Sequence, residues 1–426
     1  MRQSQLFTKT RKEAPSDEVS TNAQLLIRAG YIHKEMAGVY AFLPLGLRVI
    51  EKIKEIVREE MNDAGGEEVT LSALQDPELW KETDRWNDDA VDVWFKTKLK
   101  NDTEIGLGFT HEEPMTRMMK DHISSHRDLP RSVYQFQKKF RNETRAKSGI
   151  MRTREFVMKD LYTFARDEEE HNALYERMAE AYANVFDRVG LGDRTFKTFA
   201  SGGVFSKYSH EFQTLTPAGE DTIYVQKEKG IAINEEVYSP EVLKDLDVEE
   251  SELTKEPASE VGNIFSLGTR FSEPLGLTYK NEEGVDMPVV MGSYGIGPAR
   301  IMGVAVETFA DENGLVWPES IAPYTVHLVG LNGEDEEIRD YTDGIYSALV
   351  ARGVEVLYDD RDLRPGEKFA ESDLLGIPYR VVVSRRTKEE GQFEVVTRAD
   401  KETRMLSEEE LYNDFSKTDD SNDDDD

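Results

Sequence analysis

The stretch FRNETRAKSGIMRTREFVMKD, residues 140–160, decides the fold of this chain. With the residues on either side it predicts two antiparallel strands, SVYQFQKKFRNET at 132–144 and REFVMKDLYTFA at 154–165, joined by the loop RAKSG. Residues 138–156 carry seven Lys or Arg, although the whole chain has a formal net charge of -32. The positive charge is local, which indicates an anionic ligand at this hairpin.

The polar residues of the hairpin suggest which anion it is. Side chains on a strand alternate between faces, so Arg141 and Glu143 should share one face with Arg152 and Phe156 of the returning strand. Arginine forks bind phosphate oxygens, an aromatic ring stacks on a base, and a carboxylate accepts from an exocyclic amine. This set is typical of a nucleoside triphosphate site, and a solvated ladder of salt bridges is the alternative interpretation.

Composition limits the class of protein. Hydrophobic residues make up 38% of the 426 residues, and no apolar run or leader sequence is visible, so we expect a globular protein of the cytoplasm without membrane contact. The absence of cysteine excludes disulfides and thiolate zinc sites, and the seven His show no metal-ligand spacing, so we expect no structural metal. The excess of acidic over basic residues argues against a protein that coats nucleic acid without sequence preference.

The chain divides where its composition changes. Helices are predicted at 44–66 and from Glu168 to about Val189, and the first domain has grouped strands, which favours an α+β domain built on an antiparallel sheet. After WPESIAPY, residues 317–324, strands and helices alternate, which is typical of an α/β domain with a mainly parallel sheet. The predicted domains are 1–321, with a short acidic insertion at 222–260, then 322–415 and a disordered acidic tail at 416–426.

Three motifs resemble those of class II aminoacyl-tRNA synthetases. Residues 140–160, with Arg152, Phe156 and Asp160, are similar to motif 2; MGSYGIGPARIMG, residues 291–303, is similar to motif 3 and carries Arg300; the helix from Pro44 and EEVTLSALQDPELW are similar to motif 1. The stretches GFTHEEP at 108–114, YSHEFQ at 208–213 and EVGNIFSLGTRFSE at 260–273 resemble prolyl-tRNA synthetases of the bacterial type. The resemblance covers nearly the whole chain except residues 226–259 and the tail.

The resemblance implies a two-step reaction. Proline and ATP, accompanied by Mg²⁺, give prolyl-adenylate, and the prolyl group then passes to the 3′ end of tRNA(Pro); motif 1 implies a homodimer. Arg141 is expected at the α-phosphate and the proline carboxylate, Arg152 and Arg300 at the β- and γ-phosphates, Phe156 on adenine and Glu143 near its amino group. Arg141 and Arg300 are the expected catalytic residues. Magnesium ligands cannot be assigned from spacing.

The resemblance also implies residues that bind proline and tRNA. Thr110 and Glu112 are expected to receive the secondary ammonium, while His210 and Glu211 are expected in the pocket wall. From the residues alone, Glu112 could be a carboxylate that starts a helix, and His210 a buried structural histidine. Arg361, Arg364 and Lys368, in DRDLRPGEK, are expected to contact the anticodon stem, with a solvated turn as the alternative.

One departure from the bacterial type concerns proofreading. The segment from Thr222 to Pro288 is too short for the large editing domain of those enzymes, so we expect no hydrolysis of Ala-tRNA in cis and expect either a separate deacylase or tolerated errors. Two other functions stay open. One is a synthetase for threonine, histidine or glycine, although no zinc-binding set for threonine is visible, and the other is a non-catalytic synthetase-like protein, which should lack the motif arginines.

Overall fold

The computed structural model describes residues 1–144, 148–201 and 208–416. Residues 145–147 of the predicted loop RAKSG and the acidic tail from residue 417 lie outside the described residues. Contacts group the chain into two units, one formed by residues 34–40 and 53–308 and the other by residues 1–33, 41–52 and 309–426. We call them the sheet unit and the C-terminal unit. The predicted domains are continuous in sequence, whereas each of these units combines separate segments of the chain.

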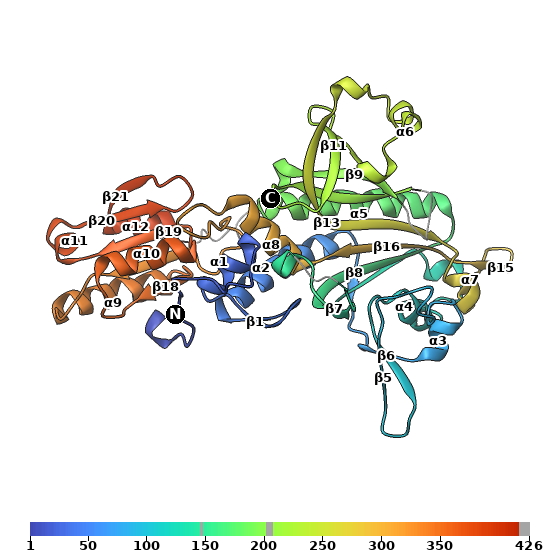
Figure 1. Ribbon diagram of the computed structural model, residues 1–426, viewed down its shortest axis with the longest axis horizontal. Coiled ribbons are helices and arrows are strands. Elements are labelled where there is room, and N and C mark those ends of the chain that lie inside the picture. Colours follow the sequence, from blue (N-terminus) through green and yellow to red (C-terminus); the bar gives the residue numbers. More distant parts are fainter. Residues whose placement is uncertain (145–147, 202–207, 417–426) are drawn as a thin grey trace, which may run out of the picture. The chain divides into compact units, whose positions relative to one another are not determined.

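A nine-stranded sheet forms the frame of the sheet unit, in the order β10-β9-β12-β11-β13-β16-β8-β7-β3. Its pairs are antiparallel except β12 with β9 and β3 with β7, so the predicted antiparallel sheet is confirmed (Figure 1). The strands are β3 (Glu67–Glu68), β7 (Arg131–Phe140), β8 (Glu155–Ala165), β9 (Thr195–Ser201), β10 (Tyr208–Leu215), β11 (Asp221–Gln226), β12 (Ile231–Asn234), β13 (Thr254–Gly268) and β16 (Val290–Ile296).

The predicted hairpin is present, but its strands are shorter than the sequence indicated. β7 and β8 pair antiparallel from Arg131 opposite Phe164 to Phe140 opposite Glu155. Arg141, Glu143 and Arg152 therefore lie beyond the strand ends, and alternation along a strand is the wrong reason for their grouping. The two arms of the hairpin are still joined just beyond the strand ends, since the main-chain N–H of Arg141 donates to the Arg154 carbonyl at 2.8 Å.

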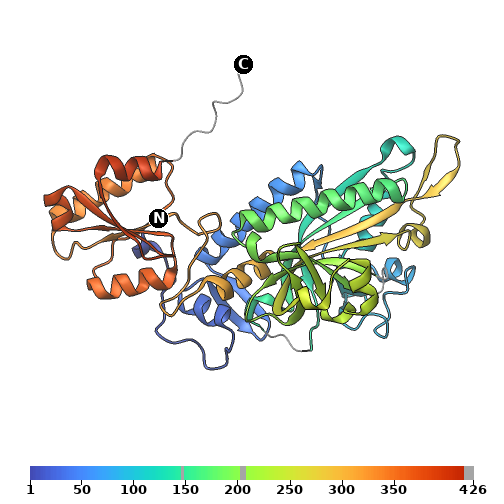
Figure 2. The same cartoon turned by 90° about the horizontal axis from the view of Figure 1, so that it is seen from above.

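Two helices match the sequence prediction closely. α2 spans Pro44–Asp63, and α5 spans Glu168–Arg188. Asp167 caps the N-terminus of α5, since its carboxylate accepts from the Glu170 N–H at 2.9 Å. Its buried residues recur every three or four positions, so one face of α5 lies along the sheet (Figure 2). The buried residues on that face include Leu174, Met178, Tyr182, Val185 and Phe186.

The segment predicted as an insertion is partly integrated into the sheet. Residues 221–226 form β11, residues 231–234 form β12, and β13 begins at Thr254 and pairs with β11 from Thr254 to Ala258. Between them lies a short helix, α6 (Pro240–Asp245), which begins at Ser239. The segment 222–260, predicted as an insertion, therefore includes strands of the sheet. These strands are held in the fold because alternating residues such as Ile223 and Val225 pack into a buried cluster with Ala232 and Ala258.

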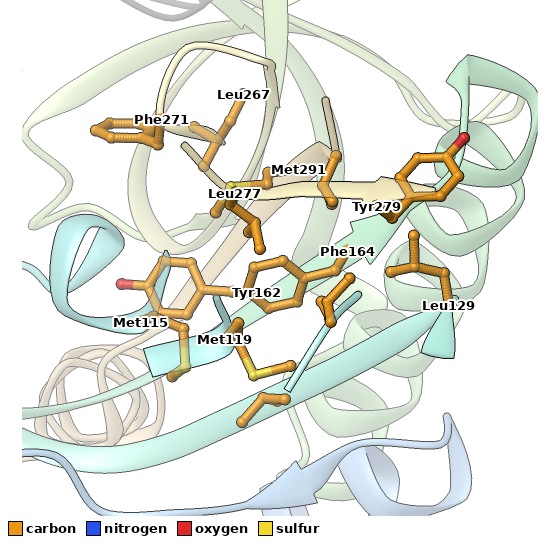
Figure 3. Close-up of a cluster of buried hydrophobic side chains, with 13 residues drawn as sticks. Met115, Met119, Leu129, Tyr162, Phe164, Leu267, Phe271, Leu277, Tyr279 and Met291 are labelled. Carbon is orange, nitrogen blue, oxygen red and sulfur yellow. The ribbon is translucent and has the colours of Figure 1, made fainter. Parts of the chain in front are cut away.

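A hydrophobic cluster fixes the part of the sheet that carries the site. It joins β8 and β16 to α4 (Glu112–Met119) through Tyr162, Met291, Met115 and Met119, all buried (Figure 3). Each such side chain contributes about 1.5–3 kcal/mol by leaving water. Because α4 is anchored by its methionines, Glu112 at its first position is held against the sheet.

The C-terminal unit contains a five-stranded sheet in the order β18-β17-β19-β20-β21. β17 pairs in parallel with β18 and β19, but β19–β20 and β20–β21 are antiparallel. The predicted α/β domain is therefore confirmed, with a sheet that is parallel in β18, β17 and β19 and antiparallel at β20 and β21 instead of mainly parallel. The sequence analysis missed β21, which pairs along the edge of β20. The elements are β17 (Val326–Gly330), α9 (Glu336–Ala351), β18 (Val356–Asp359), α10 (Pro365–Leu375), β19 (Tyr379–Val383), β20 (Gln392–Thr397) and β21 (Thr403–Ser407).

Candidate active site

A hollow on the sheet unit gathers the predicted triphosphate residues. Arg141, Glu143, Arg152, Phe156 and Arg300 all line it, although they come from the ends of β7 and β8 and from α8 (Pro298–Phe309). The guanidinium carbon of Arg141 lies 5.3 Å from the centroid of the Phe156 ring, within cation–π range. The structure therefore brings the predicted phosphate-binding cations and the aromatic ring to one place.

The charge on Arg141 is shaped by its surroundings. Burial, and after it the nearby positive charge of Arg300, lowers the pKa of Arg141 from its ordinary value. A guanidinium nevertheless stays protonated in proteins. Its Nε donates to the Phe109 carbonyl at 3.4 Å, a long contact that holds the group loosely. Arg141 is thus a poorly solvated cation, which strengthens its attraction for an anionic substrate.

The other two arginines are oriented by carboxylates. Arg152 donates from Nη2 to Glu143 Oε2 at 2.9 Å, and a second carboxylate, Glu220, lies 3.5 Å from its Nη1. Arg300 donates from Nε to the Met151 carbonyl at 3.1 Å and from Nη1 to Glu260. These contacts orient both guanidiniums at the wall of the hollow.

A second hollow adjoins the first and contains Thr110 and Glu112. The two hollows share Arg141, Glu143, Met158, Asn263 and Gly295 in their walls. Glu112 is 5% exposed, and the hydroxyl of Thr110 lies 2.7 and 2.8 Å from its two carboxylate oxygens. Thr110 and Glu112 therefore form one polar unit, separated from the phosphate residues only by the shared wall.

Several further residues line this second hollow without a role predicted from the sequence. Met158, Asp160 and Tyr162 line it from alternate positions of β8, and Phe265 and Ser293 line it from β13 and β16. The spacing of two between Met158, Asp160 and Tyr162 could have shown that these residues share a face with Phe156. Phe265 and Ser293 could not be found this way, because their strands are far away in the sequence.

A buried polar network supports the second hollow from behind. Lys139 Nζ lies 2.8 Å from Asp160 Oδ1 and 2.6 Å from His111 Nδ1, and all three residues are almost completely buried. His111 Nε2 donates to the Ser72 carbonyl at 3.0 Å, so Nδ1 accepts from the lysine. Burial, with a further contribution from Lys139, lowers the pKa of His111 to about 4. The neutral imidazole and the Lys139–Asp160 pair hold the Thr110 loop in place.

Two predicted wall residues lie elsewhere. His210 and Glu211 sit on β10 and are absent from the described residues that line the two hollows. His210 Nδ1 lies 2.9 Å from the Tyr175 hydroxyl, which donates to the Ile264 carbonyl at 3.1 Å, and burial lowers the pKa of His210 to about 4. Glu211 accepts from Gln213 and Asn234, and burial and the charge of Glu260 raise the pKa of Glu211 to about 7. In the described residues, the contacts of both side chains are thus made outside the two hollows, and their expected part in the proline pocket stays a prediction.

The three predicted tRNA contacts have different surroundings in the C-terminal unit. Lys368 is 2% exposed, and its Nζ donates to the main-chain oxygens of Gly330 at 2.6 Å and Asp359 at 3.1 Å, so its ammonium cannot contact a phosphate. Arg361 donates to Asp359 and Glu371. Arg364 is exposed at the start of α10. The expected contact does not fit Lys368, which is a structural residue.

Two negative findings hold for the described part of the chain. The described residues contain no group of three or more His, Cys, Asp or Glu arranged to hold a metal ion. Within the same residues, helices long and apolar enough to cross a membrane are also absent.

Comparison with known proteins gives matches along nearly the whole chain. A family model described as tRNA synthetase class II core domain (G, H, P, S and T) matches residues 95–309, and an anticodon binding domain model matches residues 325–418. Proline–tRNA ligases from Zymomonas mobilis and Caulobacter vibrioides are each 38% identical to this chain, covering 97% and 98% of it and 98% and 99% of their own lengths. Prolyl-tRNA synthetase from Cryptosporidium parvum, solved with halofuginone and AMPPNP, has a similar fold, with a TM-score of 0.75 at 20% identity over 92% of this chain and 75% of that one.

Proposed function

Because this chain belongs to the proline–tRNA ligase family of class II aminoacyl-tRNA synthetases, we propose that it activates L-proline with ATP and transfers the prolyl group to tRNA(Pro). The first step joins the proline carboxylate to the α-phosphorus and releases pyrophosphate. The second step moves the prolyl group to a hydroxyl of the terminal ribose and releases AMP. Neither step needs a covalent bond to the protein, so positioning and charge stabilisation account for the catalysis.

The observation that carries this proposal is the position of Arg141 in the shared wall of the two hollows. In the activation step, a carboxylate attacks a phosphate, so two anions must approach each other. A cation that lines both hollows offsets the repulsion between the carboxylate and the phosphate. It also stabilises the negative charge that develops on the phosphate oxygens. We assign Arg141 to the α-phosphate and to the proline carboxylate.

The remaining residues of the first hollow fit the parts of ATP. Arg152 and Arg300 supply fixed guanidiniums for the β- and γ-phosphates, and Phe156 offers a ring face for adenine. We assign Glu143, which lines the same hollow, to the adenine amino group as an acceptor. Glu143 also pairs with Arg152, so the carboxylate that we assign to adenine orients an arginine that we assign to the phosphates.

The second hollow fits proline. The secondary ammonium carries two protons, and Glu112 and Thr110 present oxygen acceptors for them. Met158, Tyr162 and Phe265 supply apolar surface for the ring of the substrate. We propose that Thr110 and Glu112 orient the ammonium while Arg141 holds the carboxylate.

Magnesium is proposed to arrive with the triphosphate. A preformed cluster of metal ligands is absent from the described residues. Mg²⁺ usually keeps several waters and binds through one or two carboxylates and substrate phosphates. Asp221 and Glu260 line the first hollow and fit this role. Magnesium would neutralise phosphate charge there.

Several partners complete the proposal. We assign tRNA(Pro) to the C-terminal unit through its anticodon-binding match, propose a homodimer through α2, and place the enzyme in the cytoplasm with its substrates. Ala-tRNA would be cleared by a separate deacylase or tolerated, because residues 221–268 of the described chain are largely used by β11, β12 and β13.

Amino-acid-dependent ATP–pyrophosphate exchange tests the proposed activity. All twenty amino acids are tested without tRNA, at low and high salt. We expect exchange with proline and weaker exchange with alanine. The absence of exchange with every amino acid would favour a synthetase-like binding protein, and strong exchange with a different amino acid would show that the second hollow has another substrate.

A further inference from the structure

Arg85 reaches the second hollow from the turn after α3 (Pro77–Lys81). Its side chain is 11% exposed, and its Nη1 lies 3.0 and 3.1 Å from the two carboxylate oxygens of Glu113. The same nitrogen lies farther from Glu112, at 3.3 Å from Oε2. Arg85 is therefore a buried cation shared by two consecutive buried carboxylates, and its shorter contacts are with Glu113.

Aromatic rings hold Arg85 in this position. Its guanidinium carbon lies 5.2 Å from the ring centroid of Phe271, 5.3 Å from that of Phe109 and 5.4 Å from that of Trp80. The Trp94 indole N–H donates to the Arg85 main-chain oxygen at 2.9 Å. Rings on several sides exclude water, so the interactions of Arg85 with the carboxylates are only weakly screened.

The two carboxylates have different environments. Glu113 has a fully buried side chain, and besides Arg85 it accepts from the Thr83 hydroxyl at 2.8 Å. Glu112 lines the hollow with Thr110. Glu112 is thus the carboxylate that faces the substrate. Glu113 lies directly beside it, and burial raises the pKa of Glu113 to about 7, while the charge of Arg85 opposes this shift.

Among the described residues around the second hollow, the ionisable groups pair with one another, with two exceptions. Asp160 pairs with Lys139, and Glu143 pairs with Arg152. Arg141 is left for an anion, and Arg85 neutralises one of the two charges on Glu112 and Glu113, which leaves one negative charge. One positive and one negative charge match an amino-acid zwitterion.

We propose that Arg85 is a positioning residue that neutralises Glu113, so that Glu112 stays an ionised carboxylate for the ammonium group of the substrate. The inference rests on the proposed function for the identity of the substrate, but its electrostatic argument applies to any amino acid that binds here. Without Arg85, two adjacent buried carboxylates would repel and share a proton, and Glu112 would lose attraction for the ammonium.

The test compares proline KM, ATP KM and kcat in pyrophosphate exchange for wild type, Arg85→Met, Glu113→Gln and the double variant. Met keeps the length and apolar packing of the Arg85 stem and removes its charge. We expect Arg85→Met to raise proline KM by about tenfold or more with little change in ATP KM, and to raise it further at pH 6 than at pH 8. Arg117→Met, at an exposed arginine of α4, is the matched control and should change neither KM.

The double variant separates charge balance from packing. If Arg85 acts by neutralising Glu113, then Arg85→Met with Glu113→Gln should bring proline KM back to within about threefold of the wild-type value, by the logic of a double-mutant cycle. This holds even if Arg85→Met alone fails to fold, because the double variant has no uncompensated charge at Glu113. An unchanged proline KM in Arg85→Met, or a double variant that restores neither folding nor proline KM, would overturn the inference.

A wild-type control separates this inference from the proposed function. If wild type exchanges with an amino acid other than proline, the proposed substrate is wrong, and the same four proteins are compared with that amino acid. If wild type exchanges with none, binding of proline by calorimetry replaces the KM measurement, and equal proline binding by wild type and Arg85→Met would still overturn the inference.

Discussion

Arg300 and Glu260 are joined twice: Nη1 of Arg300 donates to the Glu260 main-chain oxygen at 2.9 Å and to its carboxylate Oε2 at 3.1 Å. Arg300 lies at the start of α8, and Glu260 lies on β13. A long side chain loses rotamer freedom when it binds a phosphate, but here that freedom is already lost. The pair therefore preorganises a cation in the wall of the first hollow.

Substitution of Arg300 should weaken ATP use more than proline use. We expect Arg300→Ala to lower kcat/KM for ATP in pyrophosphate exchange by about 10² to 10³, because a preorganised cation at the phosphates is removed. The KM for proline should change far less. Arg127→Ala, at an exposed arginine, is the control. Equal losses for ATP and proline would contradict this assignment.

Arg141 should behave differently because it lines both hollows. Arg141→Lys keeps one positive charge but loses the planar fork, so we expect kcat/KM to fall by about tenfold to a hundredfold for ATP and for proline alike. Initial rates of pyrophosphate exchange, with each substrate varied in turn, measure both values. A loss confined to ATP would mean that proline does not contact Arg141.

The sequence could predict the elements whose signals are local. The β7–β8 hairpin, α2 and α5 each have a continuous pattern of residues, so they were found within a few positions. The β21 edge strand, residues 403–407, was missed, because its alternation is weak and its order comes from pairing with β20. Tertiary pairing, rather than local propensity, decides such strands.

The candidate site shows the same limit. The arginines of residues 140–160 were recognisable from their spacing, but the strand alternation used to group them was wrong. Lys368 and Arg364 are close in the sequence, yet Lys368 faces inward on α10 and Arg364 is exposed at its start. Arg85 carries no local signal, because its carboxylate partners lie about thirty residues away.

Substitutions of Lys368 and Arg364 should therefore have different effects, the first on stability and the second on tRNA binding. Lys368→Met leaves the Gly330 and Asp359 carbonyls without their donor, so we expect a loss of about 1–3 kcal/mol in the free energy of unfolding with unchanged KM for tRNA. Arg364→Ala should leave stability unchanged and raise the KM for tRNA, with a weaker salt dependence. Urea unfolding and aminoacylation at several salt concentrations measure both effects. A Lys368→Met protein of normal stability with raised tRNA KM would reverse the assignment.

Proofreading should be absent from the purified protein. We expect no hydrolysis of preformed Ala-tRNA(Pro) beyond the uncatalysed rate, since the described residues between β11 and β13 form only β12 and short helices. Mischarging should still occur, because a proline pocket rejects the smaller alanine by only about 1–3 kcal/mol. Release of alanine from labelled Ala-tRNA is the measurement. Rapid release by this chain alone would show a hydrolytic site within it.

The C-terminal unit should lose stability in acid through His327. His327 on β17 is fully buried, with Nε2 donating to Gln3 Oε1 at 3.0 Å and Nδ1 accepting from the Ser372 hydroxyl at 2.9 Å. Burial lowers the pKa of His327 to about 4, and nearby positive charges such as Arg361 act in the same direction while Asp359 opposes them. In the unfolded chain the pKa of histidine is about 6.5. The folded state therefore binds its proton at lower pH than the unfolded state.

The sign of the effect follows from proton binding. Above pH 6.5 the imidazole is neutral in both states and its contribution to stability is complete. As pH falls from 6.5 to 4, only the unfolded chain takes up the proton, so stability is lost, by up to about 3 kcal/mol.

His327→Gln should remove this part of the pH dependence, so that the free energy of unfolding falls less between pH 7 and pH 4 than in wild type. Urea unfolding at both pH values measures the difference, with the exposed His122→Gln as control. An equal fall in wild type and His327→Gln would mean that His327 is not the group that takes up the proton on unfolding.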